Sequence, residues 1–163
     1  MYNIPLGNQY PSYFVYQTGY YDYDLRNSQG QFAQVTKAVL DAIIGEATAI
    51  DFYNRLINAA PNQKHKDNIH HALEDEKIHL QLFTGLYITL TGQQPVYQIK
   101  KEEFSNYNEG LRMAYEDELE AYENYRNAYL LTQDQYIRDV FFRAMTDENE
   151  HAIRFGFLSM SPS

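Results

Sequence analysis

Four glutamates and two histidines lie at positions where the surrounding pattern calls for apolar, inward-facing side chains. They are Glu46, Glu76, His79, Glu118, Glu148 and His151. Each follows the three- and four-residue spacing of its apolar neighbours, as Glu46 does between Ile43 and Ala49, so each would face the interior of a helical protein. Carboxylate oxygens and imidazole nitrogens are ligands that suit iron or manganese. The six residues are therefore candidate metal ligands.

Charge strengthens the case for metal. Burying an ionised carboxylate costs several kcal/mol unless it is paired, and four of them in one core repel one another. Lys and Arg are missing from the same apolar stripes, so the chain has no side chain there to compensate. A pair of divalent metal ions is the simplest source of the missing positive charge.

The spacing places the carboxylates level with one another. In an antiparallel helical hairpin, two residues equally distant from the turn share a height. Glu46 and Glu76 are centred on Pro61, and Glu118 and Glu148 are centred on Gln133. Each Glu-x-x-His pair then adds an imidazole on the same helical face.

The two halves of this pattern repeat at an offset of 72 residues, which indicates an internal duplication. Glu46, Ala49, Tyr53, Asp75, Glu76 and His79 correspond to Glu118, Ala121, Tyr125, Asp147, Glu148 and His151. One Glu-x-x-His motif is a weak signal. Two of them, each preceded at the same distance by a third inward-facing Glu, are much more specific.

Four long amphipathic segments would position these residues. The periodicity predicts helices over 31–60, 63–91, 106–131 and 135–157, which together favour an all-α, four-helix bundle. Pro61 cannot continue the first helix, Gly92 suits a C-terminal cap, and Thr132 with Gln135 resembles a capping box for the last helix. Residues 1–30 are rich in Tyr, Asn, Gln and Gly and show no period, so the predicted organisation is an irregular arm over 1–30 and a bundle over 31–163.

Composition excludes several classes of protein. A length of 163 residues fits one domain, and 44% hydrophobic residues suffice for a core. The formal charge of −9 disfavours nucleic-acid binding. The absence of cysteine rules out disulfides, thiolate metal sites and a catalytic Cys in this chain. No apolar stretch reaches membrane-spanning length and no signal peptide is recognisable, so we expect a cytoplasmic protein without a membrane partner.

The runs around these residues resemble the rubrerythrin-type branch of the ferritin-like di-iron and di-manganese carboxylate superfamily. The resemblance covers residues 31–157 and rests on 45–53, 75–79, 118–125 and 147–151. It implies two hairpins joined by a long crossover. Residues 92–105 could extend over about 45 Å, at about 3.3 Å per residue. That exceeds the length of about 39 Å of a 26-residue helix, so the second and third helices could run parallel.

The resemblance also implies a role for each residue. Glu76 and Glu148 would bridge two ions, Glu46 and Glu118 would each bind one ion, and His79 and His151 would lie on different ions. Asp75 would accept a hydrogen bond from His151, and Asp147 from His79. Tyr53 and Tyr125 would hydrogen-bond carboxylates across the bundle, with plain core packing as the alternative.

This chain differs from rubrerythrins proper in two respects. Rubrerythrins proper carry a further carboxylate one turn after the ligand Glu of the third helix, where this chain has Ala121. They also carry a cysteine-rich rubredoxin domain, which a chain without cysteine lacks. Electrons for a peroxidase cycle would then come from a separate donor.

The expected function is a dinuclear iron protein, with manganese as the alternative metal, that reacts with O2 or hydrogen peroxide as an oxidase or peroxidase, or as a catalase with manganese. Two alternatives are iron handling without an organic substrate and a structural, coat-like role for a metal-stabilised bundle. Size-exclusion chromatography would separate storage from a homodimer, which is the expected state.

Other polar clusters are expected at the surface. His65, His70 and His71 favour a solvated helix face over a surface metal site. Glu74, Glu116, Asp117, Glu120 and Glu150 are expected to face solvent. Tyr115, Tyr122 and Tyr129 fall on successive turns and would suit either a dimer interface or packing within the chain.

Overall fold

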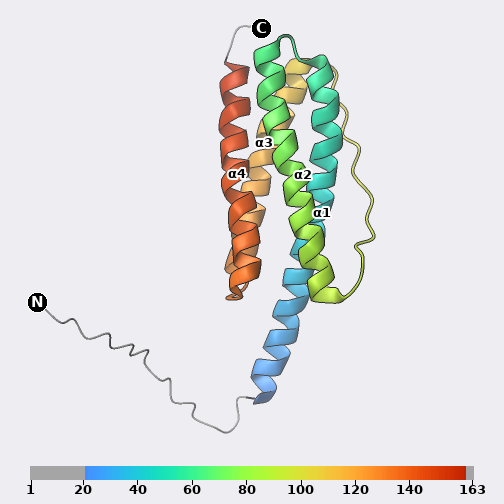
Figure 1. Cartoon of the computed structure of the whole chain (residues 1–163). Helices are drawn as coiled ribbons and strands as arrows, with labels where there is room; N and C mark the ends of the chain where they lie inside the picture. Colours follow the sequence, from blue (N-terminus) through green and yellow to red (C-terminus); the bar gives the residue numbers. More distant parts are fainter. Residues whose placement is uncertain (1–20, 161–163) are drawn as a thin grey trace, which may run out of the picture.

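The computed structural model describes residues 21–160, with side chains from residue 29 onward (Figure 1). This part of the chain forms four helices, α1 (Tyr21–Ala59), α2 (Gln63–Thr91), α3 (Tyr107–Leu130) and α4 (Gln135–Ser159). Between residues 21 and 160 no strand is present. The predicted all-α, four-helix bundle is confirmed.

The helices pack as two hairpins. The most extensive contacts are those of α1 with α2 and of α3 with α4, while α1 also borders α3 and α2 borders α4. Figure 1 shows that α2 and α3 run in the same direction, and that the segment between them passes along the outside of the bundle. The predicted long crossover is therefore confirmed.

Polar side chains fix the starts of three helices. Asn62, Asn106 and Asp134 are the N-cap residues of α2, α3 and α4, and each accepts a hydrogen bond from the backbone amide three residues later. Gly92, with φ of 70°, ends α2 in the left-handed conformation that glycine adopts most readily.

The predicted capping box of Thr132 and Gln135 is wrong. Asp134 caps α4 instead, because its Oδ1 accepts from the Ile137 amide at 3.0 Å. Thr132 Oγ1 accepts from the amide of Asp134 at 3.1 Å and so stabilises the turn before the helix. A carboxylate directly before the first helical residue reaches that amide and also complements the positive end of the helix dipole.

The first helix begins ten residues earlier than predicted, at Tyr21 rather than Gln31. The predicted irregular arm is therefore wrong for residues 21–30, and its remaining part, 1–20, lies outside the described residues. Apolar periodicity reports burial rather than helicity. Residues 29–34 are all exposed, so this part of α1 carries no buried stripe that the sequence could reveal.

The end of the crossover is fixed to α1. The guanidinium of Arg55 donates to the carbonyl of Glu102 at 2.7 Å, and the amide of Lys100 donates to Thr48 Oγ1 at 3.2 Å. The ring of Phe104 meets that of Phe52 edge-on, with centroids 5.3 Å apart. These contacts hold the end of the crossover beside the C-terminal third of α1.

The apolar core is divided into two clusters. One contains Val35, Val39, Ala42, Ile43, Phe83, Leu86, Tyr125, Ala128, Ile137, Val140, Phe141 and Ala144. The other contains Phe52, Tyr53, Leu56, Ile69, Ala72, Leu73, Leu111, Ala114, Phe155 and Leu158. On every helix the candidate ligands lie between members of the two clusters, so a polar layer separates them.

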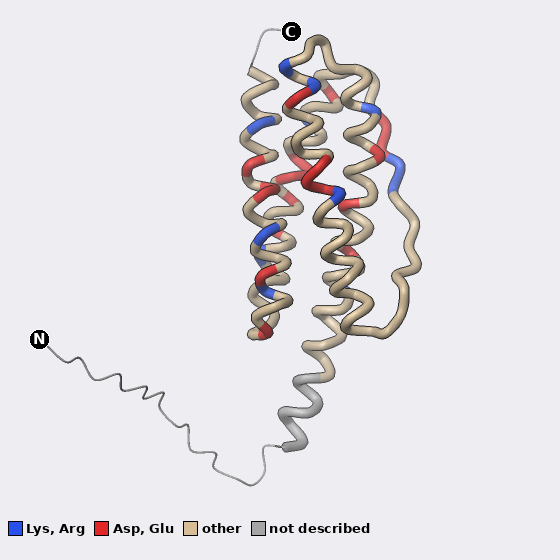
Figure 2. The backbone as a smooth tube through the Cα atoms, viewed as in Figure 1, with Lys and Arg blue, Asp and Glu red and all other residues tan. Residues whose placement is uncertain are grey.

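The polar layer coincides with a band of charge. Figure 2 shows acidic residues gathered around the middle of the bundle. Among the described residues, no helix combines the length and apolar character that a membrane span requires.

Candidate metal centre

The structure brings all six candidate ligands together at the middle of the bundle. Glu46 comes from α1, Glu76 and His79 from α2, Glu118 from α3, and Glu148 and His151 from α4. None of these six residues is more than 3% exposed. Residues as far apart in sequence as Glu46 and His151 thus share one buried polar layer.

The six residues form two overlapping groups, each suited to one ion. The first group is Glu46, Glu76, His79 and Glu148, and the second is Glu76, Glu118, Glu148 and His151. Within each group, one ligand atom from every residue lies within 4.8 Å of the others. Glu76 and Glu148 belong to both groups, which is the position that bridging carboxylates require.

The imidazoles face the shared carboxylates through their Nδ1 atoms. His79 Nδ1 lies 3.3 Å from oxygens of both Glu76 and Glu148. His151 Nδ1 lies 3.1 Å from Glu76 and 3.0 Å from Glu148. The outer glutamates are each near one histidine, since Glu46 is 3.9 Å from His79 and Glu118 is 3.4 Å from His151.

The other nitrogen of each histidine is held by an aspartate from the opposite hairpin. His79 Nε2 is 3.0 Å from Asp147 Oδ2, and His151 Nε2 is 3.2 Å from Asp75 Oδ2. When Nε2–H donates to the carboxylate, Nδ1 is left to face the centre as a donor atom for a metal. These are the two pairings that the resemblance implies.

Two tyrosines cross the bundle to the outer glutamates. Tyr53 of α1 donates its hydroxyl proton to Glu118 of α3 at 2.5 Å, and Tyr125 of α3 donates to Glu46 of α1 at 2.5 Å. Both rings also belong to the apolar clusters, so packing and hydrogen bonding occur together. The bonds fix the orientation of each outer carboxylate.

Burial and crowding shift the titration of the centre. Burial, reinforced by the charge of Glu76, raises the pKa of Glu46 well above its usual value, and burial with the charge of Glu148 does the same for Glu118. Burial alone would lower the pKa of His79, but hydrogen bonding to Asp147, Glu148 and Glu76 outweighs it and raises that pKa to about 12. Without metal, the centre therefore retains protons to balance its charge.

Two atoms of the centre show that hydrogen bonding within the protein does not satisfy it. Among the described residues, Oε1 of Glu76 and Oε1 of Glu148 are buried without a hydrogen-bond partner. Each instead lies close to an imidazole nitrogen, Glu76 Oε1 at 3.1 Å from His151 Nδ1 and Glu148 Oε1 at 3.3 Å from His79 Nδ1. A buried carboxylate oxygen that accepts no hydrogen bond is costly, and both of these oxygens belong to the carboxylates that the two groups share. The donor set, four carboxylates and two imidazoles, fits a pair of iron or manganese ions.

One of the three histidines outside the centre differs from the prediction. His65 is not solvated: it is 2% exposed, and its Nδ1 lies 2.7 Å from the hydroxyl of Tyr107. The reason is its place in the first turn of α2, where the ring packs against α3. His70 and His71 are exposed as predicted, and His71 Nε2 lies 3.3 Å from Asp75.

The acidic side chains predicted to face solvent do so, namely Glu74, Glu116, Asp117, Glu120 and Glu150. Of the three tyrosines on successive turns, Tyr115 is exposed, while Tyr122 and Tyr129 are half-buried. Tyr129 stacks with Phe142 of α4 and lies under the guanidinium of Arg138, so it packs within the chain.

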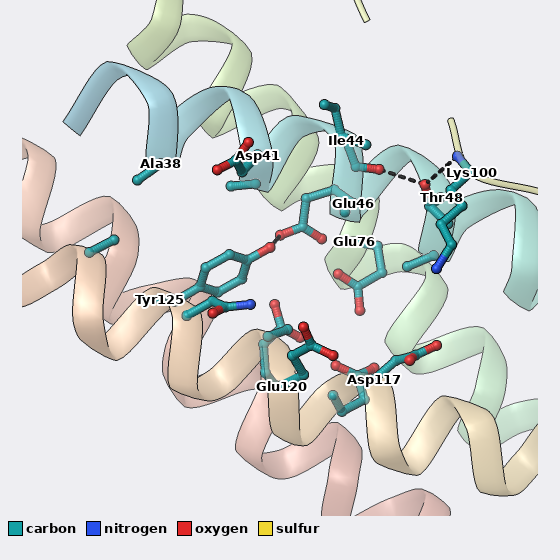
Figure 3. A pocket seen from close by; sticks show the side chains of 18 of the residues that line it. Ala38, Asp41, Ile44, Glu46, Thr48, Glu76, Lys100, Asp117, Glu120 and Tyr125 are labelled. Atoms are coloured by element: carbon teal, nitrogen blue, oxygen red, sulfur yellow. Dashed lines mark hydrogen bonds between the residues drawn. The ribbon is translucent and has the colours of Figure 1, made fainter. Parts of the chain in front are cut away.

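A cavity next to the centre was not predicted from the sequence. It lies between α1 and α3, has a volume of about 580 Å³, and reaches all four glutamates of the centre; we call it the α1/α3 chamber. Figure 3 shows Glu46, Glu76 and Tyr125 pointing into it. The signal in the sequence is a set of small residues on the facing helices, Ala38, Ala42, Gly45 and Ala49 on α1 and Ala121 and Ala128 on α3.

Comparison with known families agrees with the geometry. The sequence profile of the Rubrerythrin family matches residues 37–158, which include all six candidate ligands. The chain belongs to the rubrerythrin family. The match spans α2, α3 and most of α1 and α4, and so includes the whole polar layer.

A similar sequence and similar folds occur in several bacteria. An uncharacterized protein of Bacillus subtilis, YhjR, is 34% identical over 119 residues, covering 73% of this chain and 82% of that protein. A ferritin-like, di-iron carboxylate protein of Bacillus anthracis has a similar fold, with a TM-score of 0.69 at 18% identity over 78% of this chain and 96% of its own. A conserved hypothetical protein of Mycobacterium tuberculosis has a TM-score of 0.69 at 17% identity over 81% and 96% of the two chains.

Proposed function

We propose that this rubrerythrin-family protein holds two iron ions in its polar layer and reacts with O2 or hydrogen peroxide as an oxidoreductase. The observation that carries the proposal is the pair of buried groups that share Glu76 and Glu148. Each shared carboxylate keeps one buried oxygen without a hydrogen bond. Burying these carboxylates costs free energy without cations, and bound cations would offset that cost.

The residues would divide the work of holding the ions. Glu76 and Glu148 would bridge, because each lies in both groups. Glu46 with His79 would serve one ion, and Glu118 with His151 the other. A bound pair of iron ions would supply the electrons that O2 or peroxide accepts.

The surrounding side chains would keep this ligand set in place. Asp147 and Asp75 would hold the histidines so that Nδ1 faces the ions. Tyr53 and Tyr125 would fix the outer carboxylates through their short hydrogen bonds. The α1/α3 chamber would admit small molecules to the side of the centre that lies away from the two histidines.

The electron donor would be a separate molecule, because the chain has no cysteine with which to build a rubredoxin-type iron centre. Manganese suits the same ligands and would favour disproportionation of peroxide. Metal analysis of protein from its native host would identify the metal.

Anaerobic loading with Fe(II), followed by rapid mixing with O2 or hydrogen peroxide, tests the proposal. We expect two ions per chain and an absorbance change that Glu76→Gln abolishes. Glu116→Gln, which changes an exposed carboxylate of α3, serves as the matched control. Fewer than two ions, or loaded protein that leaves both oxidants unchanged, would refute it.

A second candidate is iron handling, in which Fe(II) is oxidised for storage or detoxification. The acidic side chains at the mouth of the chamber, Asp41, Glu102, Asp117 and Glu120, favour the approach of cations. Size-exclusion chromatography and iron titration distinguish the two. A hollow oligomer that accumulates many irons per chain would favour storage over the proposed oxidoreductase.

A further inference from the structure

We propose that the α1/α3 chamber binds a neutral or cationic organic molecule with an apolar body, held against the metal centre. The inference rests on the proposed function, since it assigns a substrate class to the same site. It follows from the volume and the apolar wall of the chamber, from the carboxylates of the centre that line it and from the charge at its mouth.

The chamber exists because small side chains face one another across α1 and α3. Gly45 and Ala49 line it from α1, and Ala121 and Ala128 line it from α3. A methyl group added at Gly45 would meet only the hydroxyl of Tyr125, at 3.7 Å, so no tight backbone contact requires a glycine there. The space is thus open where larger apolar residues would have filled a core.

The opposite face of the centre carries the two imidazoles. His79 and His151 occupy it, and Asp75 and Asp147 lie behind them within hydrogen-bonding distance. The chamber, by contrast, is lined by Glu46, Glu76, Glu118 and Glu148. Glu76 and Glu148, the carboxylates that both groups share, are among these lining residues. A molecule in the chamber would therefore meet the carboxylate side of the centre.

The volume is larger than the oxidants need. O2 and hydrogen peroxide contain two heavy atoms each, whereas a cavity of about 580 Å³ falls within the range that holds small organic ligands. Much of the wall is apolar, including Ile44, Phe52, Leu131 and Phe141. Such a wall offers nothing to a hydrated metal ion but favours an apolar body through the area it removes from water.

The mouth selects against anions. Asp41 of α1, Glu102 of the crossover, and Asp117 and Glu120 of α3 surround it, and Figure 3 shows Asp117 and Glu120 together on one side. Lys100 is the basic residue among those that line the chamber, and its Nζ is already 2.6 Å from Glu102. A carboxylate or phosphate would meet like charge there, whereas a hydroxyl or ammonium group would not.

Three probes with the same body test this selection: 4-phenylbutanol, 4-phenylbutyl-trimethylammonium and 4-phenylbutanesulfonate. The affinity of each probe is measured by calorimetric titration into the full-length protein. The protein is loaded with zinc, which has no redox chemistry, so that no turnover occurs during the measurement. We expect the alcohol and the ammonium probe to bind saturably, and the sulfonate to bind about tenfold more weakly or worse. Glu120→Gln should reduce the difference in affinity between the ammonium probe and the sulfonate.

Filling the chamber provides the structural control. Ala49→Leu and Ala121→Leu, on the two facing helices, should each weaken binding of the alcohol by about tenfold because the added side chain occupies the same space. Ala33→Leu changes an exposed alanine of the same helix α1 and should leave binding unchanged. Circular dichroism and zinc content confirm that each variant is folded and loaded.

The proposal is overturned if none of the probes binds saturably, if the sulfonate binds as tightly as the ammonium probe, or if both filled variants bind the alcohol like the wild type. Slower Co(II) uptake by the filled variants, without binding of any probe, would instead assign the chamber to metal entry. Probe binding by a protein that fails to react with O2 or peroxide would refute the proposed function and leave the chamber assignment standing.

Discussion

His71 and Arg143 occupy equivalent positions, 72 residues apart, and each lies against the aspartate that holds a central histidine. His71 Nε2 is 3.3 Å from Asp75, and Arg143 Nε is 4.0 Å from Asp147. One aspartate thus faces an imidazole and the other a permanent cation. The candidate ligands repeat symmetrically, but the side chains behind them differ, so we expect the two candidate metal positions to be chemically unequal.

Removing either aspartate should weaken metal binding. Asp147→Asn and Asp75→Asn keep the shape of the side chain but lose the charge that orients His79 or His151, which typically costs 10–100-fold in affinity. Competition titration with a coloured chelator measures this, with Asp67→Asn, an exposed position on α2, as control. If the two ions bound with equal affinity in the wild type and in both variants, the expected difference between the two metal positions would be contradicted.

Replacing Tyr125 by Phe should lower the free energy of unfolding of the metal-free protein by about 1–2 kcal/mol. The ring would still pack against Phe83 and Phe141, but Glu46 would lose its hydroxyl donor. Urea denaturation measures the change, and Tyr136→Phe at an exposed ring is the control. A loss no larger than that of the control would show that Tyr125 acts through packing alone.

Replacing Glu46 by Gln should move stability and metal affinity in opposite directions. The raised pKa of Glu46, caused by burial and by the charge of Glu76, means that its ionised form is costly in the metal-free fold. An isosteric neutral amide should therefore leave the metal-free protein at pH 8 as stable or about 1 kcal/mol more stable, while metal affinity falls at least about tenfold. Thermal denaturation with and without metal checks both, and Glu116→Gln should change neither. A clear loss of metal-free stability would count against the electrostatic account.

Metal binding should release protons and strengthen as pH rises. Hydrogen bonding to Asp147 and two glutamates raises the pKa of His79 to about 12 in the metal-free centre, despite the opposing effect of burial. A ligating imidazole must be unprotonated at the nitrogen that binds, so at pH 7 an ion has to displace that proton. Calorimetry in buffers of different ionisation enthalpy counts the protons released. Affinity that stays constant between pH 6 and pH 9 would refute this.

Two glycines should respond to alanine in opposite ways. A methyl group at Gly110 would come within 2.8 Å of Leu56 Cδ1 and 3.0 Å of Phe104, so Gly110→Ala should destabilise the protein by about 1–3 kcal/mol. A methyl group at Gly85, in the C-terminal part of α2, meets nothing within 4 Å, and Gly85→Ala should stabilise the protein by about 0.5–1 kcal/mol. Chemical denaturation distinguishes them. Equal effects would mean that Phe104 does not pack as described.

The sequence predicted the bundle well because, in a helical hairpin, the height of a residue follows from its distance in sequence from the turn. Once Pro61 and Gln133 are taken as turn centres, equal distances along two helices place Glu46 opposite Glu76 and Glu118 opposite Glu148. Side-chain type then identifies the polar layer. Nothing in that reasoning depends on rotamers.

The features that the sequence did not predict depend on how the helices pack against one another, not on the spacing of residues along the chain. His65 is polar and near a helix end, yet its burial depends on Tyr107 lying across the bundle. The chamber depends on how far apart α1 and α3 lie, which the alanines alone do not determine. Residues 29–34 near the start of α1 are all exposed, so apolar periodicity gave no signal for a helix there.

The division of ligands between the hairpins has a consequence for how such a fold can be assembled. Each hairpin supplies two glutamates and one histidine, and neither ion position is complete without residues from both hairpins. Two copies of the first hairpin, related by a two-fold axis, would therefore present the same set of candidate ligands as the whole chain, four glutamates and two histidines. The crossover joins in one polypeptide what a pair of short identical subunits could build, and it leaves the supporting residues, such as His71 and Arg143, free to diverge between the halves.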